Sequence, residues 1–166
     1  MAKKLNISKS ESEQVTIIGI SCMDNDYRLI YFMSKALSSS FVKLEDISFY
    51  GKEGKLGDFS FYHHKQEDTR LNYFLFSNKK SGQIAVTNFK NFDYFLLIIG
   101  EIDTLYESSI LNSIRNIPIL QAAILIPHSG LKNIEYLLED IEMHLVTLKL
   151  SKRENKDLWV DKTHLA

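Results

Sequence analysis

The segment Phe92–Ile99 constrains the fold more than any other part of the chain. A polar stretch, 86–91, leads through Asp93 and Tyr94 into the uninterrupted apolar run Phe95-Leu96-Leu97-Ile98-Ile99. An apolar run of this length is typical of a strand that is buried on both faces. It is too short to cross a bilayer as a helix, which takes about 20 residues. We therefore expect this segment to lie deep inside a β-sheet.

Five further segments predict strands, and three predict helices. The strands are indicated by β-branched or alternating residues between turn formers. The helices are indicated by apolar spacing, by Asp24, Asn25 and Asp26 as N-caps, and by Pro118 as a stop. Besides 93–99, the expected strands are 15–21, 41–49, 58–63, 71–76 and 121–126, and the expected helices are 27–37, one that begins near 103–104, and 131–143.

Two strand–helix–strand units, residues 15–49 and 93–126, organise this pattern. Hairpin strands lie between them in the sequence. This order predicts an α+β fold with a mixed, mostly antiparallel sheet of about six strands and three helices packed on one face. The layout is similar to ferredoxin-like and ACT-like domains with an inserted hairpin, and by itself this analogy carries no function.

The length of 166 residues favours a single domain. Residues 1–13 are polar and are expected to be disordered, and residues 14–143 are expected to form the domain. Residues 144–166 are expected to be a C-terminal extension, either a last strand or a loose tail. Its charge run, 151–157, is expected to be solvated.

Composition narrows the classes of function. The formal net charge of -1 produces no field that would attract polyanions, so nucleic-acid and membrane-surface roles have little support. The single cysteine, Cys22, excludes an internal disulfide, and residues 1–11 lack the apolar stretch of a secretion signal. We therefore expect a cytoplasmic protein that binds neither nucleic acid nor membrane.

Several short motifs occur in an order that resembles the bacterial IPExxxVDY family, a set of uncharacterised proteins named after one motif. Only Asp93 and Tyr94 match the motif itself, because other residues replace its isoleucine, proline, glutamate and valine. The resemblance spans roughly residues 15–139 and implies a cytoplasmic bacterial protein without an assigned catalytic residue. The residues at the changed motif positions are Val86, Thr87, Asn88 and Phe92, and the supporting context is Gly19-Ile20-Ser21, Asp26-Tyr27-Arg28-Leu29, Lys35-Ala36-Leu37, Glu45-Asp46 and the apolar run into Gly100.

Asp93 and Tyr94 are the first candidate site. An acid at the start of a strand, beside a tyrosine hydroxyl, could face a groove. Adjacent residues of a strand point to opposite faces, however, so the two side chains are not expected to act together. The favoured interpretation is a carboxylate that pins the preceding loop through backbone N–H groups, followed by a buried aromatic residue.

The histidine pair His63-His64, with Glu67 and Asp68, comes nearest to a metal-ligand set. The two histidines would face opposite ways along a strand, so a solvated hairpin tip is favoured and no metal is expected. Cys22 lies just before a predicted helix, where a thiol pKa can fall, but a buried structural cysteine is favoured.

Two loops are candidate ligand sites. Gly100, Glu101 and Asp103 follow the buried strand, at a place where ACT-like domains bind small ligands, although a glycine there also suits a tight turn. Asp26-Tyr27-Arg28 begins a predicted helix, where an anion could bind. Asp24 and Asp26 already place negative charge there, so the favoured interpretation is capping acids with Tyr27 in the core.

No catalytic residue and no cofactor is predicted. The strands around 59–62 and 73–76 carry more aromatic residues than one face of a sheet needs. The leading interpretation is therefore a non-enzymatic protein that acts through protein contact, as a homodimer. The alternative is an ACT-like small-ligand sensor with its site at 100–103. An enzyme would require two of Asp93, His63 and Cys22 to share one pocket.

Overall fold

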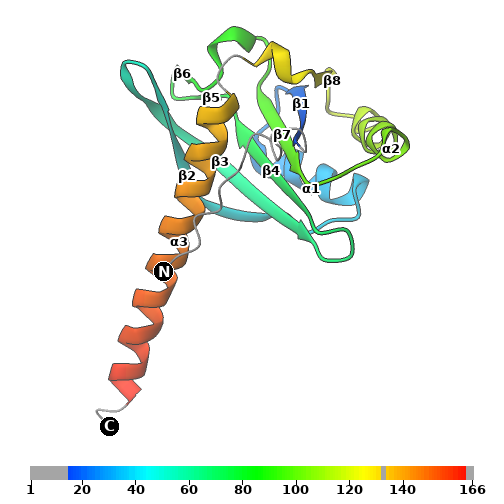
Figure 1. The fold of residues 1–166 in the computed structure, drawn as a ribbon. Helices are drawn as coiled ribbons and strands as arrows, with labels where there is room; N and C mark the ends of the chain where they lie inside the picture. The colour runs from blue at the N-terminus through cyan, green and yellow to red at the C-terminus, as the bar shows by residue number, and fades with distance from the viewer. Residues whose placement is uncertain (1–14, 132–133, 164–166) are drawn as a thin grey trace.

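The computed structural model describes residues 15–131 and 134–163, and within them six strands form one sheet and three α-helices pack against it (Figure 1). The prediction for residues 1–13 lies outside the described residues. In chain order the elements are β1 (Val15–Ser21), α1 (Asp26–Ala36), β2 (Val42–Gly51), β3 (Gly54–Gln66), β4 (Leu71–Ser77), β5 (Lys79–Lys80), β6 (Gln83–Ile84), η2 (Thr87–Phe89), β7 (Tyr94–Ile99), α2 (Thr104–Arg115), β8 (Ala122–Ile126), η3 (His128–Gly130) and α3 (Ile134–Thr163).

The strand order of the sheet is β2-β3-β4-β7-β1-β8, and every neighbouring pair is antiparallel. The predicted α+β fold with a mostly antiparallel sheet is therefore confirmed. Both strand–helix–strand units are present. β7 and β8 are parallel on either side of β1, and β1 and β2 are parallel with three strands between them. Among the described residues, the parallel strands of each unit are never hydrogen-bonded to each other.

β7 lies inside the sheet, as the apolar run predicts. It pairs with β4 on one side and with β1 on the other, and five of its six residues are buried. Its side chains alternate between two separate cores. Phe95 and Leu97 point to one face of the sheet, and Leu96 and Ile98 point to the other.

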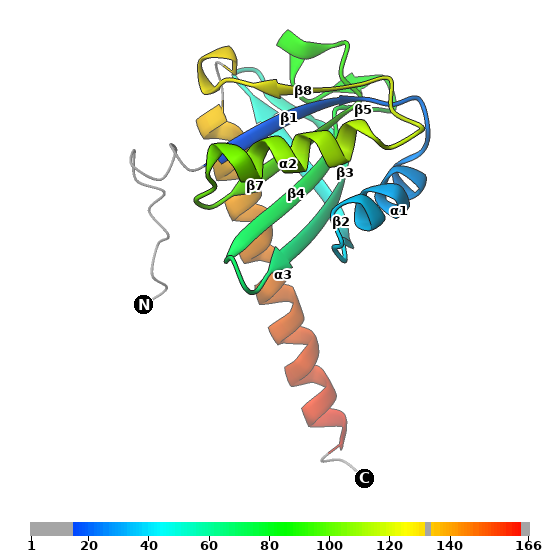
Figure 2. The ribbon, with the colours of Figure 1, turned by 90° about the vertical axis from the view of Figure 1, so that its right-hand side faces the viewer.

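The helices cover both faces of the sheet, so the prediction that they pack on one face is wrong. α1 and α2 close the core that contains Leu96 and Ile98, whereas α3 closes the core that contains Phe95 and Leu97 (Figure 2). The physical reason is that the central strands are apolar on both faces, and each face needs its own cover. A second helical layer meets that need.

The α3-side core also accounts for the aromatic strands. Rings from β2, β3 and β4 pack against one another there, with Phe61 stacked on Phe74 at 5.6 Å and Phe49 edge-on to Phe76 at 4.9 Å. These rings are all buried. Filling two cores therefore explains the aromatic content that we had attributed to a protein-contact face.

α3 is much longer than predicted. It continues past Met143 to Thr163, and its C-terminal part projects beyond the sheet (Figures 1 and 2). Leu137, Leu138 and Ile141 anchor its first turns in the core. Residues 144–163, expected to be a last strand or a loose tail, are helical. The charge run 151–157 lies within this helix, which its good helix formers Lys, Arg and Glu permit.

The segment Tyr50–Gly57, which contains three glycines, is part of a regular hairpin. β2 and β3 stay paired up to Gly51 and Gly54, which face each other across a two-residue turn. Gly54 has φ of 118°, a conformation that a side chain would strain. The hairpin tip is thereby held as a defined surface near α3.

Candidate functional site

Asp93 pins a loop, but not the loop that precedes it in the chain. Its Oδ2 accepts a 2.9 Å hydrogen bond from the backbone N–H of Cys22, and its Oδ1 lies 3.2 Å from Lys79 Nζ. The Tyr94 hydroxyl donates to the carbonyl of Asp24 at 2.8 Å, and its ring is buried. Both motif residues therefore hold the segment that joins β1 to α1.

The segment before Asp93 is organised by Asn78, which the sequence analysis did not single out. Asn78 is fully buried, and its Oδ1 accepts a 2.7 Å hydrogen bond from the Val86 N–H. Its Nδ2 donates to the carbonyls of Phe89 and Phe92, at 2.9 Å each. One amide side chain therefore shapes the whole loop that leads into β7.

Cys22 and Asp93 are brought together, so two of the three candidate catalytic residues are neighbours. The Cys22 side chain is buried, and this burial raises the pKa of its thiol. A hydrogen bond with the Asp24 backbone lowers that pKa, but burial outweighs it, and the negative charge of Asp93 adds to the increase. The thiol is therefore held in its protonated, poorly nucleophilic form. These contacts give the pair a structural role.

The start of α1 differs from its prediction in two respects, the capping residue and the place of Tyr27. The N-cap is Asn25 rather than an acid, and its side chain makes no capping hydrogen bond. Burial raises the pKa of Asp26, but hydrogen bonds from Tyr62 and Ser60 outweigh it and hold that pKa below the usual range. The Tyr62 bond measures 2.8 Å. Arg28 pairs with Asp24 at 3.4 Å. Tyr27, expected in the core, is 68% exposed, because the core-facing stripe of α1 is carried by Leu29 and Met33 instead.

The two histidines bind different partners. His63 Nε2 lies 2.9 Å from the Asn72 side chain, and its ring stacks on Phe74. His64 Nδ1 lies 3.2 Å from the carbonyl of Ser40. Within residues 15–131 and 134–163, no group of three or more His, Cys, Asp and Glu side chains is arranged to hold a metal.

The ligand-binding candidates Gly100, Glu101 and Asp103 form the connection from β7 to α2. Gly100 has φ of 135° and packs against Leu71. Asp103 caps α2, because its Oδ1 accepts a 2.7 Å hydrogen bond from the Tyr106 N–H. Glu101 is exposed. These residues lie at the opposite end of β7 from η2.

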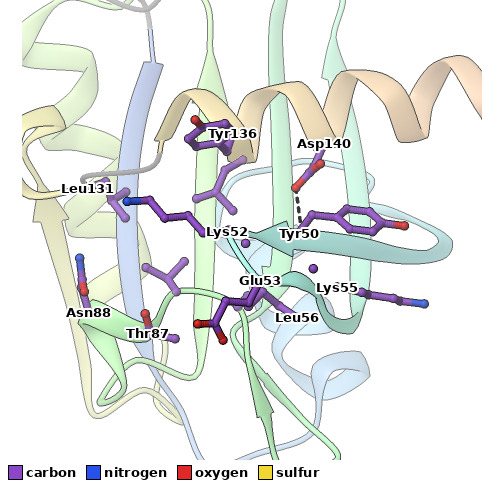
Figure 3. Close-up of a pocket in the computed structure, with 15 residues that line it drawn as sticks. Tyr50, Lys52, Glu53, Lys55, Leu56, Thr87, Asn88, Leu131, Tyr136 and Asp140 are labelled. Carbon is purple, nitrogen blue, oxygen red and sulfur yellow. Dashed lines mark hydrogen bonds between the residues drawn. The ribbon is translucent and has the colours of Figure 1, made fainter.

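A pocket of about 710 Å³ lies elsewhere, between the tip of the β2–β3 hairpin, the segment before and within η2, and the start of α3 (Figure 3). This volume is in the range of small-molecule sites, roughly 300–1,000 Å³. None of the sequence-predicted site residues lines it. The lining residues are Tyr50, Gly51, Lys52, Glu53, Gly54, Lys55, Leu56, Ala85, Val86, Thr87, Asn88, Leu131, Tyr136, Leu137 and Asp140.

β8 forms one edge of the sheet, and this edge is a second candidate interaction surface, after the pocket. Its five residues, Ala122–Ile126, carry no charge. The side chains of Ile124 and Leu125 are 47% and 37% exposed, and they point to opposite faces of the sheet. An uncharged apolar edge strand is a template for pairing with another chain.

No protein-family model matches the chain, and no curated protein matches it closely enough to count as a relative. The resemblance to the IPExxxVDY family therefore stays a prediction. Among the described residues, none of the helices combines the length and the apolar character that crossing a bilayer requires.

Proposed function

We propose that this protein acts through contact between chains, as a homodimer in which two β8 strands pair antiparallel across a two-fold axis. The observation that supports it is the uncharged β8 edge, with its two exposed aliphatic side chains. Two copies would then share one continuous sheet of twelve strands, from six in each chain. Such a contact is isologous, with the same surface on both copies.

The backbone geometry of β1 identifies the free groups of β8. The carbonyl of Ile20 accepts from the Asp93 N–H, so the polar groups of Ile20 point toward β7. Ile20 lies opposite Ala123, and this pair therefore exchanges no hydrogen bonds. The N–H and C=O groups of Ala123 and Leu125 consequently point outward. A 2.9 Å hydrogen bond from Arg115 Nε to the Ala123 carbonyl agrees with this direction.

These four outward groups favour one register. With Ile124 on the two-fold axis, Ala123 of each chain lies opposite Leu125 of the other, and every outward N–H meets an outward C=O. The Arg115 bond leaves the second lone pair of the Ala123 carbonyl free. The side chains also suit this register, because Leu125 meets the small Ala123, and Ile126 meets the small Ala122.

The other edge strand, β2, is protected. Its register with β3 shifts between Leu44 and Ile47, and it carries Lys43, Glu45 and Asp46. Two side chains of α3 also hydrogen-bond the backbone of β2. Asp140 accepts from the Tyr50 N–H, and His144 donates to the Glu45 carbonyl. Bulges, charges and covering elements are the usual defences of an edge strand. Among the residues that the structure describes, β8 has no charge of its own and no register shift, and Arg115 contacts its outward side.

The cytoplasmic setting and the bacterial origin belong to the same proposal. A buried free thiol at Cys22 suits a reducing compartment. A role in contact rather than catalysis is supported by the structural contacts of Asp93 and His63 and by the raised pKa of the Cys22 thiol.

Sedimentation equilibrium over a wide range of protein concentration tests the homodimer. The wild-type protein is expected to approach twice the chain mass at high concentration, with weak affinity because a five-residue edge gives a small interface. Ile124→Lys is expected to stay at the chain mass, since it places two ammonium groups opposite each other on the axis. Val42→Lys, at a 59% exposed position of the β2 edge, is the matched control.

Two results would count against the proposal. One is a wild-type protein that keeps the mass of a single chain at millimolar concentration. The other is a Val42→Lys variant that loses association as fully as Ile124→Lys does, because the contact would then lie at the β2 edge or depend on net charge alone. Far-ultraviolet circular dichroism of each variant establishes that the fold is retained.

A further inference from the structure

We propose that the pocket between the β2–β3 hairpin, η2 and α3 binds a short peptide with a free amino terminus and a free carboxyl terminus. This inference is independent of the proposed dimer, because no residue of β8 lines the pocket. It rests on the placement of charge, amide and apolar groups around the pocket.

The first wall carries a cation and an amide. Figure 3 shows the side chain of Lys52 stretched from the hairpin tip toward Leu131, with Asn88 on the same side of the pocket. Lys52 makes no ion pair with any residue that the structure describes. An unpaired ammonium beside an amide N–H₂ group suits a carboxylate, which accepts hydrogen bonds from both.

The opposite wall carries a carboxylate. Asp140 on α3 lies at the other side of the pocket, where its Oδ2 accepts a 3.1 Å hydrogen bond from the Tyr50 N–H (Figure 3). Burial raises the pKa of this carboxyl, and the neighbouring Glu139 raises it further. A ligand ammonium at the second oxygen would offset both effects by pairing with the charge.

The space between the two charged walls is apolar and large. Val86, Leu131 and Leu137 are buried beneath it, and Tyr136 borders it with a largely exposed ring. A ligand that spans from Asp140 to Lys52 therefore places aliphatic groups in the middle. A short peptide combines an ammonium at one end, a carboxylate at the other and aliphatic side chains between them, and the volume of about 710 Å³ exceeds what a single amino acid fills.

Glu53 defines how the peptide would be oriented. It lines the pocket beside Lys52, on the hairpin tip, and would repel a carboxylate placed close to it (Figure 3). The ligand carboxylate is therefore expected on the Asn88 side of Lys52. The opposite orientation would place the carboxylate against Asp140, where like charges disfavour it.

Isothermal titration calorimetry with alanyl-leucyl-alanine tests the proposal. The free tripeptide is expected to bind, and acetylation of its amino terminus or amidation of its carboxyl terminus is each expected to weaken binding by about tenfold or more, the loss of one charge-assisted contact. Asp140→Asn is expected to weaken binding of the free peptide but not of the acetylated one. Lys52→Met is expected to weaken binding of the free peptide but not of the amidated one.

Lys55→Met is the matched control, because Lys55 lines the rim but points away from the pocket and pairs with Asp58 at 3.0 Å. It should leave affinity unchanged. Measurements on the Ile124→Lys variant separate this inference from the dimer, since peptide binding should survive there. No binding of the free tripeptide at millimolar concentration would overturn the inference, and so would equal affinity for the free and the capped peptides.

Discussion

Asn78→Ala is expected to lower the free energy of unfolding by about 3–5 kcal/mol. The reason is the number of buried groups that depend on one side chain. The amide of Asn78 satisfies the Val86 N–H and the carbonyls of Phe89 and Phe92. Each buried group left without its partner costs about 1–3 kcal/mol. Urea unfolding, followed by circular dichroism, measures the loss directly.

The matched control for this variant is Asn88→Ala. Asn88 has the same side chain and lies within η2, in the loop that Asn78 holds, but it is exposed. Its replacement should change the free energy of unfolding by no more than about 0.5 kcal/mol. If the two variants were equally stable, Asn78 would not be the organiser of the loop that leads into β7.

Gly19→Ala is expected to destabilise the domain by about 2 kcal/mol, although alanine is ordinarily better than glycine in a strand. A Cβ at Gly19 would lie 2.9 Å from Ile126 Cδ1 and 2.9 Å from two carbons of the Phe92 ring. β1 is hydrogen-bonded on both sides, so it cannot shift to relieve this overlap. Thermal unfolding and urea unfolding should both report the loss.

A second substitution tests whether the overlap is the cause. Ile126→Val removes the Cδ1 atom, so the double variant with Gly19→Ala should lose less stability than the two single changes added together. Ile114→Val, in the core on the other face, is the control and should combine additively with Gly19→Ala. Additive behaviour of both pairs would show that crowding against Ile126 is not responsible.

The local elements of the fold could be predicted because their signals are local. Each signal lies within the element that it predicts or directly before it. Examples are the apolar run of β7, the β-branched run of β1 and the Asp103 cap of α2. The order and the pairing of the strands were not predicted. The prediction of an α+β sheet therefore depended on short stretches of sequence.

The parts that were missed depend on contacts between distant residues. Asn78 looks like an ordinary turn residue in the sequence, and only the path of residues 85–92 around it reveals its role. The second helical layer could not be predicted, because α3 packs on β2, about ninety positions earlier in the chain. The pocket combines three such segments. Val86, Thr87 and Asn88, at changed positions of the resembled motif, lie in one of them, but nothing in the sequence brings the other two segments beside it.

The β8 edge was also missed, although one signal was present in the sequence. Ala122–Ile126 is short and uncharged, and nothing in its composition shows which side of it is open. That information comes from the strand order, which ends at β8. The prediction of a homodimer came instead from the aromatic strands, which the two cores account for.

Disulfide cross-linking of Ile124→Cys is the most direct test of the pairing of two β8 strands. On the two-fold axis, residue 124 faces its own copy as a non-hydrogen-bonded pair, whose Cα atoms lie about 4.5 Å apart, within the range that a disulfide spans. We predict a cross-linked dimer for Ile124→Cys under mild oxidation, in a Cys22→Ser background, and none for Val42→Cys. A monomeric Ile124→Cys protein with its thiol still free, or cross-linking of equal extent through Val42→Cys, would contradict the account.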